Sequence, residues 1–220
     1  AAHTLRRSGI LLSNPDALSV ASKVSHWLFD KTGTLTIGKP SVENVALFSA
    51  MSEQECLTMV ADIEHLSDHS LAYAFAGFAS ELGQTKQIDE FIDVPGCGVR
   101  ALYDREQVLI GKRHWVLEQL VNKAQREVAD KLLAQIVRLS NHHPGASEVA
   151  VAHAGSLVAV IHVRDSMRTS SFSALSQLKA TGASVKVISG DRPSAVAAVC
   201  DELSVNDYQA DMLPADKLGV

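Results

Sequence analysis

The chain has 220 residues, a formal net charge of −5 and 46% hydrophobic residues, which is typical of a globular protein with one or two real cores. Lys and Arg form no basic stripe, so the usual electrostatic footprint of a nucleic-acid-binding protein is excluded. Three distant cysteines, at 56, 97 and 200, argue against a disulfide framework. No apolar run approaches the roughly 18 residues of a membrane span, so we expect a soluble segment, cut from a longer protein.

The first predicted element is a buried strand over residues 25–30, SHWLFD, which ends at Asp30. A lysine, three threonines and two glycines follow within the next eight residues. In α/β folds, polar groups at the ends of parallel strands are where ligands bind and react. The alternative is a plain polar turn after a strand.

Between residues 41 and about 160, apolar and polar side chains alternate as in antiparallel strands with one solvent-exposed face. Predicted strands cover 41–50, 98–104, 107–111, 147–155 and 156–163, and predicted helices cover 52–66, 70–82 and 124–140. Ser52 and Glu55 have the spacing of a capping box. We interpret the helical stripe of Val128, Leu132, Ile136 and Leu139 as core rather than as a cofactor surface.

The last part of the chain returns to an α/β pattern. It predicts a helix over 170–182, a strand over 184–191, and a helix over 192–203 with Pro193 in its first turn. The expected fold class is therefore α/β, with a parallel layer interrupted by an inserted antiparallel α+β domain. We assign residues 1–40 and 161–220 to the parallel layer and residues 41–160 to the insertion.

Asp30 and Asp191 both end predicted parallel strands, where loops and helix N-termini point N–H groups at anions. A carboxylate there can attack a phosphoryl group and form an aspartyl phosphate, provided that positive charge offsets the phosphate oxygens. Lys31 and Lys217 are candidate cations, and Mg²⁺ would supply the remaining charge. Gly33 permits a tight loop and close approach of phosphate.

Three segments in the same order resemble motifs of P-type ATPases. DKTGTLT (30–36) is similar to the phosphorylation motif of that family, SGD (189–191) to its T-G-D loop, and LPADK (213–217) to its P-x-x-K segment. The resemblance implies that Asp30 is the nucleophile, and that its carboxylate and the Thr32 carbonyl bind Mg²⁺.

The same resemblance implies roles for the neighbouring polar groups. Phosphoryl oxygens would be held by Thr32, Ser189, Gly190 and Lys217, and Asp191 would order the site. The family also carries a G-D-G-x-N-D loop downstream, which supplies another Mg²⁺ carboxylate and does not occur in these 220 residues. We therefore expect weak or no phosphorylation by this chain alone.

The inserted segment resembles the nucleotide domain of heavy-metal-transporting P-type ATPases. ADIEHLSDHSLAYAF (61–75) is similar to the family's E…S-E-H-P-L-A segment, with Asp68 for Glu and Ser70 for Pro. VPGCGV (94–99) and LIGKRHW (109–115) are similar to the G-x-G-V and I-G-N segments, with Lys112 in place of Asn. The nucleotide-site candidates are Glu64, His69, Gly96, Gly98 and Gly111. Alternatively, His69 caps a helix and the first two of these glycines form a bulge.

The resemblance as a whole implies a haloacid-dehalogenase-like phosphorylation domain with an inserted nucleotide-binding domain. The parent would be an ion-translocating ATPase, with copper favoured as its ion and ATP and Mg²⁺ as cofactors. Its expected partners are ATP, the transmembrane and actuator domains of the parent, and a metal chaperone, but no nucleic acid. We expect the cytosolic side of a membrane protein, in a bacterial inner membrane.

Two other functional classes stay open at this point. A stand-alone phosphatase of the haloacid dehalogenase type generally carries a second aspartate two residues after the nucleophile, and here that position is Thr32. Without that carboxylate to activate water, an aspartyl phosphate hydrolyses slowly. A non-catalytic nucleotide-binding module would bind ATP without needing Asp30.

Overall fold

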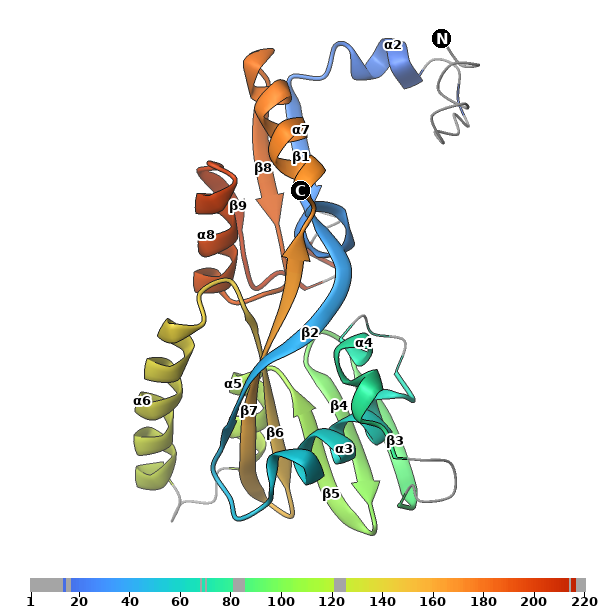
Figure 1. The fold of residues 1–220 in the computed structure, drawn as a ribbon, viewed down its shortest axis with the longest axis vertical. Helices are drawn as coiled ribbons and strands as arrows, with labels where there is room; N and C mark the ends of the chain where they lie inside the picture. Colours follow the sequence, from blue (N-terminus) through green and yellow to red (C-terminus); the bar gives the residue numbers. More distant parts are fainter. Residues whose placement is uncertain are drawn as a thin grey trace.

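The strands form two separate sheets in a computed structural model that describes residues 14, 17–67, 69, 71–80, 86–120, 126–213, 215 and 216. The three-stranded sheet has the order β1-β8-β9, and the six-stranded sheet has the order β2-β7-β6-β5-β4-β3. Figure 1 shows the smaller sheet above and the larger sheet below, joined by two long strands. We call them, with their helices and loops, the smaller lobe and the larger lobe.

The smaller lobe has the predicted parallel α/β pattern. Its strands are β1 (His26–Asp30), β8 (Ser184–Ile188) and β9 (Asp207–Gln209), and its helices are α7 (Thr169–Ala180) and α8 (Pro193–Glu202). β1 and β8 pair in parallel, with Asp30 opposite Ile188. Pro193 opens α8, where its missing N–H is not needed. A core of Leu175, Val187, Val196 and other apolar side chains holds these elements together.

The larger lobe is an antiparallel sheet, as predicted. Its strands are β2 (Thr36–Leu47), β3 (Ile88–Val94), β4 (Gly98–Tyr103), β5 (Glu106–Gly111), β6 (Ser147–His153) and β7 (Ser156–Met167). β3 was not predicted. It is an edge strand, and a bulge between Asp89 and Ile92 breaks the two-residue alternation on which the prediction depends.

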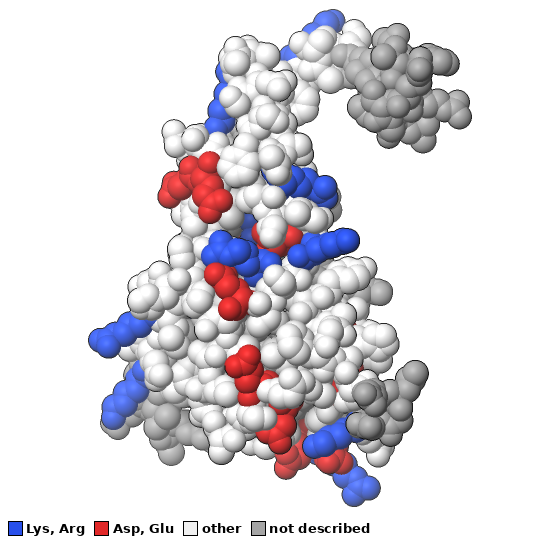
Figure 2. Space-filling view, in the orientation of Figure 1, with Lys and Arg blue, Asp and Glu red and all other residues white. Residues whose placement is uncertain are grey.

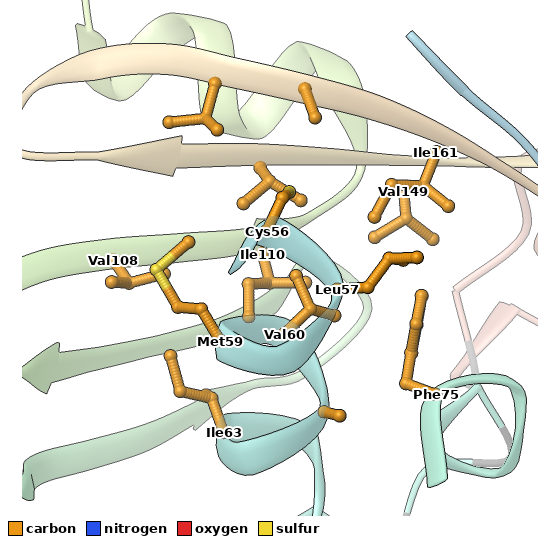
Figure 3. Packing of buried hydrophobic residues seen from close by; sticks show 14 of the residues in the cluster. Cys56, Leu57, Met59, Val60, Ile63, Phe75, Val108, Ile110, Val149 and Ile161 are labelled. Atoms are coloured by element: carbon orange, nitrogen blue, oxygen red, sulfur yellow. The ribbon is translucent and has the colours of Figure 1, made fainter. Parts of the chain in front are cut away.

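One face of the larger sheet is covered by α3 (Glu53–Glu64), which starts at the predicted capping box. The Ser52 hydroxyl accepts from the Glu55 N–H at 3.2 Å, and the Glu55 carboxylate accepts from the Ser52 N–H at 2.9 Å. Figure 3 shows Leu57 and Val60 of this helix pointing at the strands, close to Ile110. Burial of these side chains is the main force that fixes α3 on the sheet.

The larger lobe also contains α4 (Ala72–Phe75), α5 (Arg113–Leu120) and α6 (Arg126–His142), and α2 (Ala17–Ala21) precedes β1. The helix predicted over 70–82 is shorter in the described residues: after α4 a single tight turn ends at Phe78. The Asp62 carboxylate accepts the Ser80 N–H and hydroxyl, both at 2.8 Å, and so holds the chain in a non-helical path. In α6, Ile136 is fully buried, as expected of the core stripe.

β2 and β7 run from one lobe to the other (Figure 1). They pair from Leu47 with Ala159 as far as Thr36 with Met167, next to the loop that follows Asp30. The predicted domain boundaries, after residues 40 and 160, therefore fall inside two paired strands, and the division into domains stays a prediction. None of the helices in the described part of the chain has the length and apolar character needed to cross a bilayer.

Candidate functional site

A cavity of about 590 Å³ lies between the two lobes and is lined by residues of both. The smaller lobe contributes predicted residues near the ends of β1 and β8, namely Thr32, Ser189, Gly190 and Asp191. The larger lobe contributes the whole predicted nucleotide set, namely Glu64, His69, Gly96, Gly98 and Gly111. The fold thus brings two groups of candidates, far apart in sequence, to one space.

Asp30 is the last residue of β1, directly before the loop that reaches this cavity. In that loop Thr32 has an extended backbone, while Gly33 has a φ of 74°, which favours glycine. The loop therefore leaves the strand, turns sharply and brings Thr32 to the cavity wall. Lys217, the other predicted cation, lies outside the described residues.

Lys31 points into the protein and forms an ion pair with Asp191. Only 4% of the Lys31 side chain is exposed, so this ammonium neutralises the second aspartate rather than lining the cavity. Because the two residues follow β1 and β8, the ion pair ties together the loops at the ends of two neighbouring strands.

Asp191 is held by two serine hydroxyls as well. Ser189 donates to Oδ2 at 3.0 Å, and Ser147 of the larger lobe donates to Oδ1 at 2.6 Å. Burial would raise the pKa of Asp191, but the charge of Lys31 and these hydrogen bonds outweigh it and hold the pKa below its ordinary value. Asp191 is therefore an anion at neutral pH, and its contacts cross between the lobes.

Two residues that the sequence did not point to hold the start of β2, directly after the loop that follows Asp30. The Asp165 carboxylate in β7 accepts the backbone N–H groups of Gly38 at 3.0 Å and Lys39 at 3.1 Å, and the hydroxyl of Thr36. Arg168, just beyond β7, donates to the carbonyl oxygens of Thr36, Ile37 and Gly33. No local pattern links these two residues to a loop so far away along the chain.

On the other side of the cavity, Glu64 ends α3 and is only 6% exposed. Burial, together with the nearby charge of Asp93, raises the pKa of Glu64 to about 7. His69 lines the same wall, and its Nδ1 accepts the N–H of Leu71 at 3.2 Å. That hydrogen bond orders the turn before α4, which begins at Ala72 and has no side-chain capping bond, so His69 does not cap this helix, and it lines the cavity.

Gly98 and Gly111 face each other in β4 and β5, where the two backbones approach very closely. A Cβ atom on Gly98 would lie 2.1 Å from the Ile110 carbonyl oxygen, and one on Gly111 would lie 2.3 Å from that of Cys97. Since backbone atoms cannot move aside, only glycine fits at either position. The two glycines therefore let β4 and β5 pack backbone against backbone where both strands line the cavity.

Replacing Glu64 by Gln should stabilise the chain at pH 8. Because the pKa of Glu64 is higher in the folded protein than its ordinary value, its contribution to the free energy of unfolding is fully present below about pH 4.5. That contribution is lost as the pH rises through about 7. Glutamine does not ionise, so it avoids that loss. Urea unfolding should show a free energy of unfolding that is about 2–3 kcal/mol larger for the variant at pH 8, and a much smaller difference at pH 5.

The matched control for Glu64→Gln is Glu118→Gln, at an exposed position of α5. It should change the free energy of unfolding by less than about 0.5 kcal/mol at either pH. A Glu64→Gln protein that is equally stable or less stable than the parent at pH 8 would contradict the assigned cause.

Known proteins are similar to this chain over almost its whole length. A family model described as haloacid dehalogenase-like hydrolase matches residues 25–218. The copper-transporting ATPase RAN1 of Arabidopsis thaliana is 30% identical over 97% of the chain and 23% of its own length. The copper-exporting P-type ATPase of Vibrio cholerae is 31% identical over 95% of the chain and 22% of its own length. The zinc/cadmium/lead-transporting P-type ATPase of Escherichia coli is 33% identical over 96% of the chain and 27% of its own length.

Solved structures give the same fold. The catalytic domain of the CPx-ATPase CopB-B superposes with a TM-score of 0.73 at 23% identity, over 99% of this chain and 73% of that chain. A zinc-transporting PIB-type ATPase in its E2.Pi state gives a TM-score of 0.55 at 30% identity, over 99% of this chain and 34% of that chain.

The expected fold class is thus confirmed, and so is the expected group of relatives. The chain spans about a quarter of the length of the curated relatives that it matches. It belongs to the haloacid dehalogenase-like hydrolases, and its homologues are heavy-metal P-type ATPases.

Proposed function

We propose that this chain is the ATP-binding and phosphorylation region of a heavy-metal-translocating P-type ATPase, with copper as the transported ion. The observation that carries the proposal is the single cavity shared by the nucleotide-site candidates and by the loops after β1 and β8. A nucleotide bound to the larger lobe would have its phosphate end directed at the loop that follows Asp30.

In the proposed reaction an oxygen of the Asp30 carboxylate attacks the γ-phosphorus of ATP. The new O–P bond forms as the bond between that phosphorus and the β–γ bridging oxygen breaks, and ADP leaves. Thr32, Ser189 and the Gly190 N–H would hold the equatorial oxygens of the phosphoryl group, with Lys217 adding charge. The Lys31 ammonium group would remain in its ion pair with the Asp191 carboxylate during this step.

The donor set near Asp30 fits Mg²⁺. The described residues contain no group of three or more His, Cys, Asp and Glu that would hold a metal ion by themselves. Mg²⁺ is usually bound by one or two protein oxygens together with waters and substrate phosphates, which the Asp30 carboxylate and the Thr32 carbonyl would provide. When bound, it would neutralise charge on the phosphates.

On the larger lobe, Gly98 and Gly111 would form part of the wall against which the nucleotide lies. His69 would lie against the base, and Glu64 would hydrogen-bond to its exocyclic amino group. Gly96, with a φ of 74°, would shape the turn at the rim. The parent protein would supply transmembrane and actuator domains and would receive its ion from a metal chaperone, with this region on the cytosolic side of a bacterial inner membrane.

The test is to label the longer protein with ATP that carries ³²P in its γ-phosphate, in the presence of Mg²⁺ and each candidate metal ion. After an acid quench and proteolysis, the label should be on the peptide that contains Asp30, and hydroxylamine should release it as an acyl phosphate. Copper(I) should stimulate labelling more than Zn²⁺. Label on another peptide, or label that resists hydroxylamine, would contradict the proposal.

A further inference from the structure

Arg192 lies just before α8 in the smaller lobe, and its side chain reaches into the larger lobe. Its Nε is 3.0 Å from a carboxylate oxygen of Glu148 in β6. Its Nη2 lies within hydrogen-bonding distance of three carbonyl oxygens, those of Ser140 at 3.4 Å, His143 at 3.2 Å and Ala146 at 3.3 Å. The guanidinium group thus bridges the two lobes.

The three carbonyl oxygens lie at the C-terminal end of α6 and in the turn that follows it. The C-terminal end of a helix carries partial negative charge, so a cation is favoured there. The same turn approaches α8 closely: a Cβ on Gly145 would lie 3.8 Å from the Cβ of Ala198 and 3.9 Å from a methyl of Val199. Arg192 and this turn therefore form one contact between the lobes.

Glu148 is shared by two arginines. Arg113 of α5 donates to its other carboxylate oxygen at 2.9 Å, and the Glu148 side chain is only 5% exposed. Figure 2 shows acidic and basic side chains together on the face of the molecule where the lobes meet. The desolvation cost of such a buried group of charges largely offsets its Coulombic attraction, so the contact sets geometry without locking it permanently.

Arg192, Glu148 and Arg113 also line the cavity between the lobes. The distance between the nucleotide-site candidates and the loop after Asp30 depends on how closely the lobes approach each other there. We propose that Arg192 is a positioning residue that holds the lobes closed over the cavity, through Glu148 and the end of α6. The role of this contact in the reaction rests on the proposed function, whereas the contact itself does not.

The experiment measures the distance between the lobes by electron paramagnetic resonance. Spin labels would be placed on exposed helical positions with Gln54→Cys in α3 and Ser176→Cys in α7, in a Cys97→Ser background, since Cys56 and Cys200 are buried. Arg192→Ala should lower the ratio of closed to open distances about three- to tenfold relative to the labelled parent. Arg138→Ala, at an exposed position of α6, is the matched control and should leave the ratio unchanged.

Further variants separate positioning from general damage. Arg192→Ala should have a smaller effect in a Glu148→Gln background, because the ionic partner is already lost and only the contacts with the end of α6 remain, and Arg192→Lys should restore part of the closed population. Circular dichroism establishes whether each variant folds. If Arg192→Ala does not fold, Arg192→Lys takes its place in the distance measurement. An unchanged ratio in the alanine variant, or a labelled parent that is already open, would overturn the proposal.

The nucleotide reaction gives an independent readout. In the longer protein, Arg192→Ala should raise the KM for ATP in phosphorylation more than it lowers the rate at saturating ATP. If the unsubstituted protein forms no aspartyl phosphate, the proposed function fails while the distance measurement still stands. If phosphorylation occurs but the ratio of distances does not respond to Arg192, only this inference fails.

Discussion

Replacing Asp30 by Asn in the longer protein should abolish acid-stable phosphorylation from ATP. The amide oxygen is a far weaker nucleophile than a carboxylate oxygen, and it cannot form the acyl phosphate. We expect labelling to fall by more than about a thousandfold, below detection, because loss of the nucleophile removes the covalent step itself. The measurement is ³²P incorporation after an acid quench, at saturating ATP and Mg²⁺.

Asp201→Asn is the matched control for Asp30→Asn, because Asp201 is an exposed carboxylate on α8 of the same lobe. It should retain labelling at close to the level of the unsubstituted protein. The Asp30→Asn protein should still bind ATP, since none of the nucleotide-site candidates is changed. Undiminished, hydroxylamine-sensitive labelling of the Asp30→Asn protein would show that another carboxylate is the nucleophile.

Replacing Lys31 by Met should destabilise the chain strongly at neutral pH. The substitution keeps the volume of the buried side chain but leaves Asp191, which accepts hydrogen bonds from Ser147 and Ser189, without its cation. Breaking a buried ion pair on one side costs about 3–5 kcal/mol, and the partial exposure of Asp191 reduces our expectation to about 2–4 kcal/mol. Urea unfolding at pH 7 measures it.

Two further results would identify the cause of that loss. Because the pKa of Asp191 is lowered in the folded protein, its stabilising contribution is present above its ordinary pKa and is lost as the pH falls. The cost of Lys31→Met should therefore shrink in acid. Adding Asp191→Asn to Lys31→Met should recover part of the stability, whereas simple additivity of the two losses would contradict the ion-pair account. Lys186→Met, at a half-buried pair with Asp207, is the control and should cost less than about 1 kcal/mol.

The elements that the sequence predicts well are those whose pattern is set by burial. β1 and β8 are short apolar runs inside a layered fold, and α3 has both a helical stripe and a capping box at Ser52. In each case the local sequence and the tertiary environment favour the same structure. That agreement makes them predictable without knowledge of their neighbours.

The elements that prediction from the sequence misses depend on contacts between residues that are distant in sequence. β9 has three residues, all exposed, so it shows no apolar pattern, and its pairing with β8 alone defines it. The helix expected over 70–82 is cut short where Asp62 captures Ser80. Nothing in the local sequence reports either contact, because each requires the folded sheet to be in place.

The candidate site divides in the same way. Asp30 and Ser189 can be found because parallel strands end at one edge of a sheet, so the loops that follow them must be neighbours. Asp165, Arg168 and Glu148 cannot be found in this way, since they act where β2, β6 and β7 bring the two lobes together. The candidate reacting groups can be predicted from the sequence, but the residues that position them cannot.

The central claim is that one cavity joins the nucleotide-site candidates of the larger lobe to the loop after Asp30 in the smaller lobe. Nuclear magnetic resonance of the ¹⁵N-labelled chain, titrated with a non-hydrolysable ATP analogue and Mg²⁺, tests it most directly. We predict amide shift changes at Glu64 and Gly98 and also at Ser189 and Gly190, whereas adenosine alone should affect only the first pair. An analogue that leaves both pairs unchanged, or that shifts the larger lobe alone just as adenosine does, would contradict the claim.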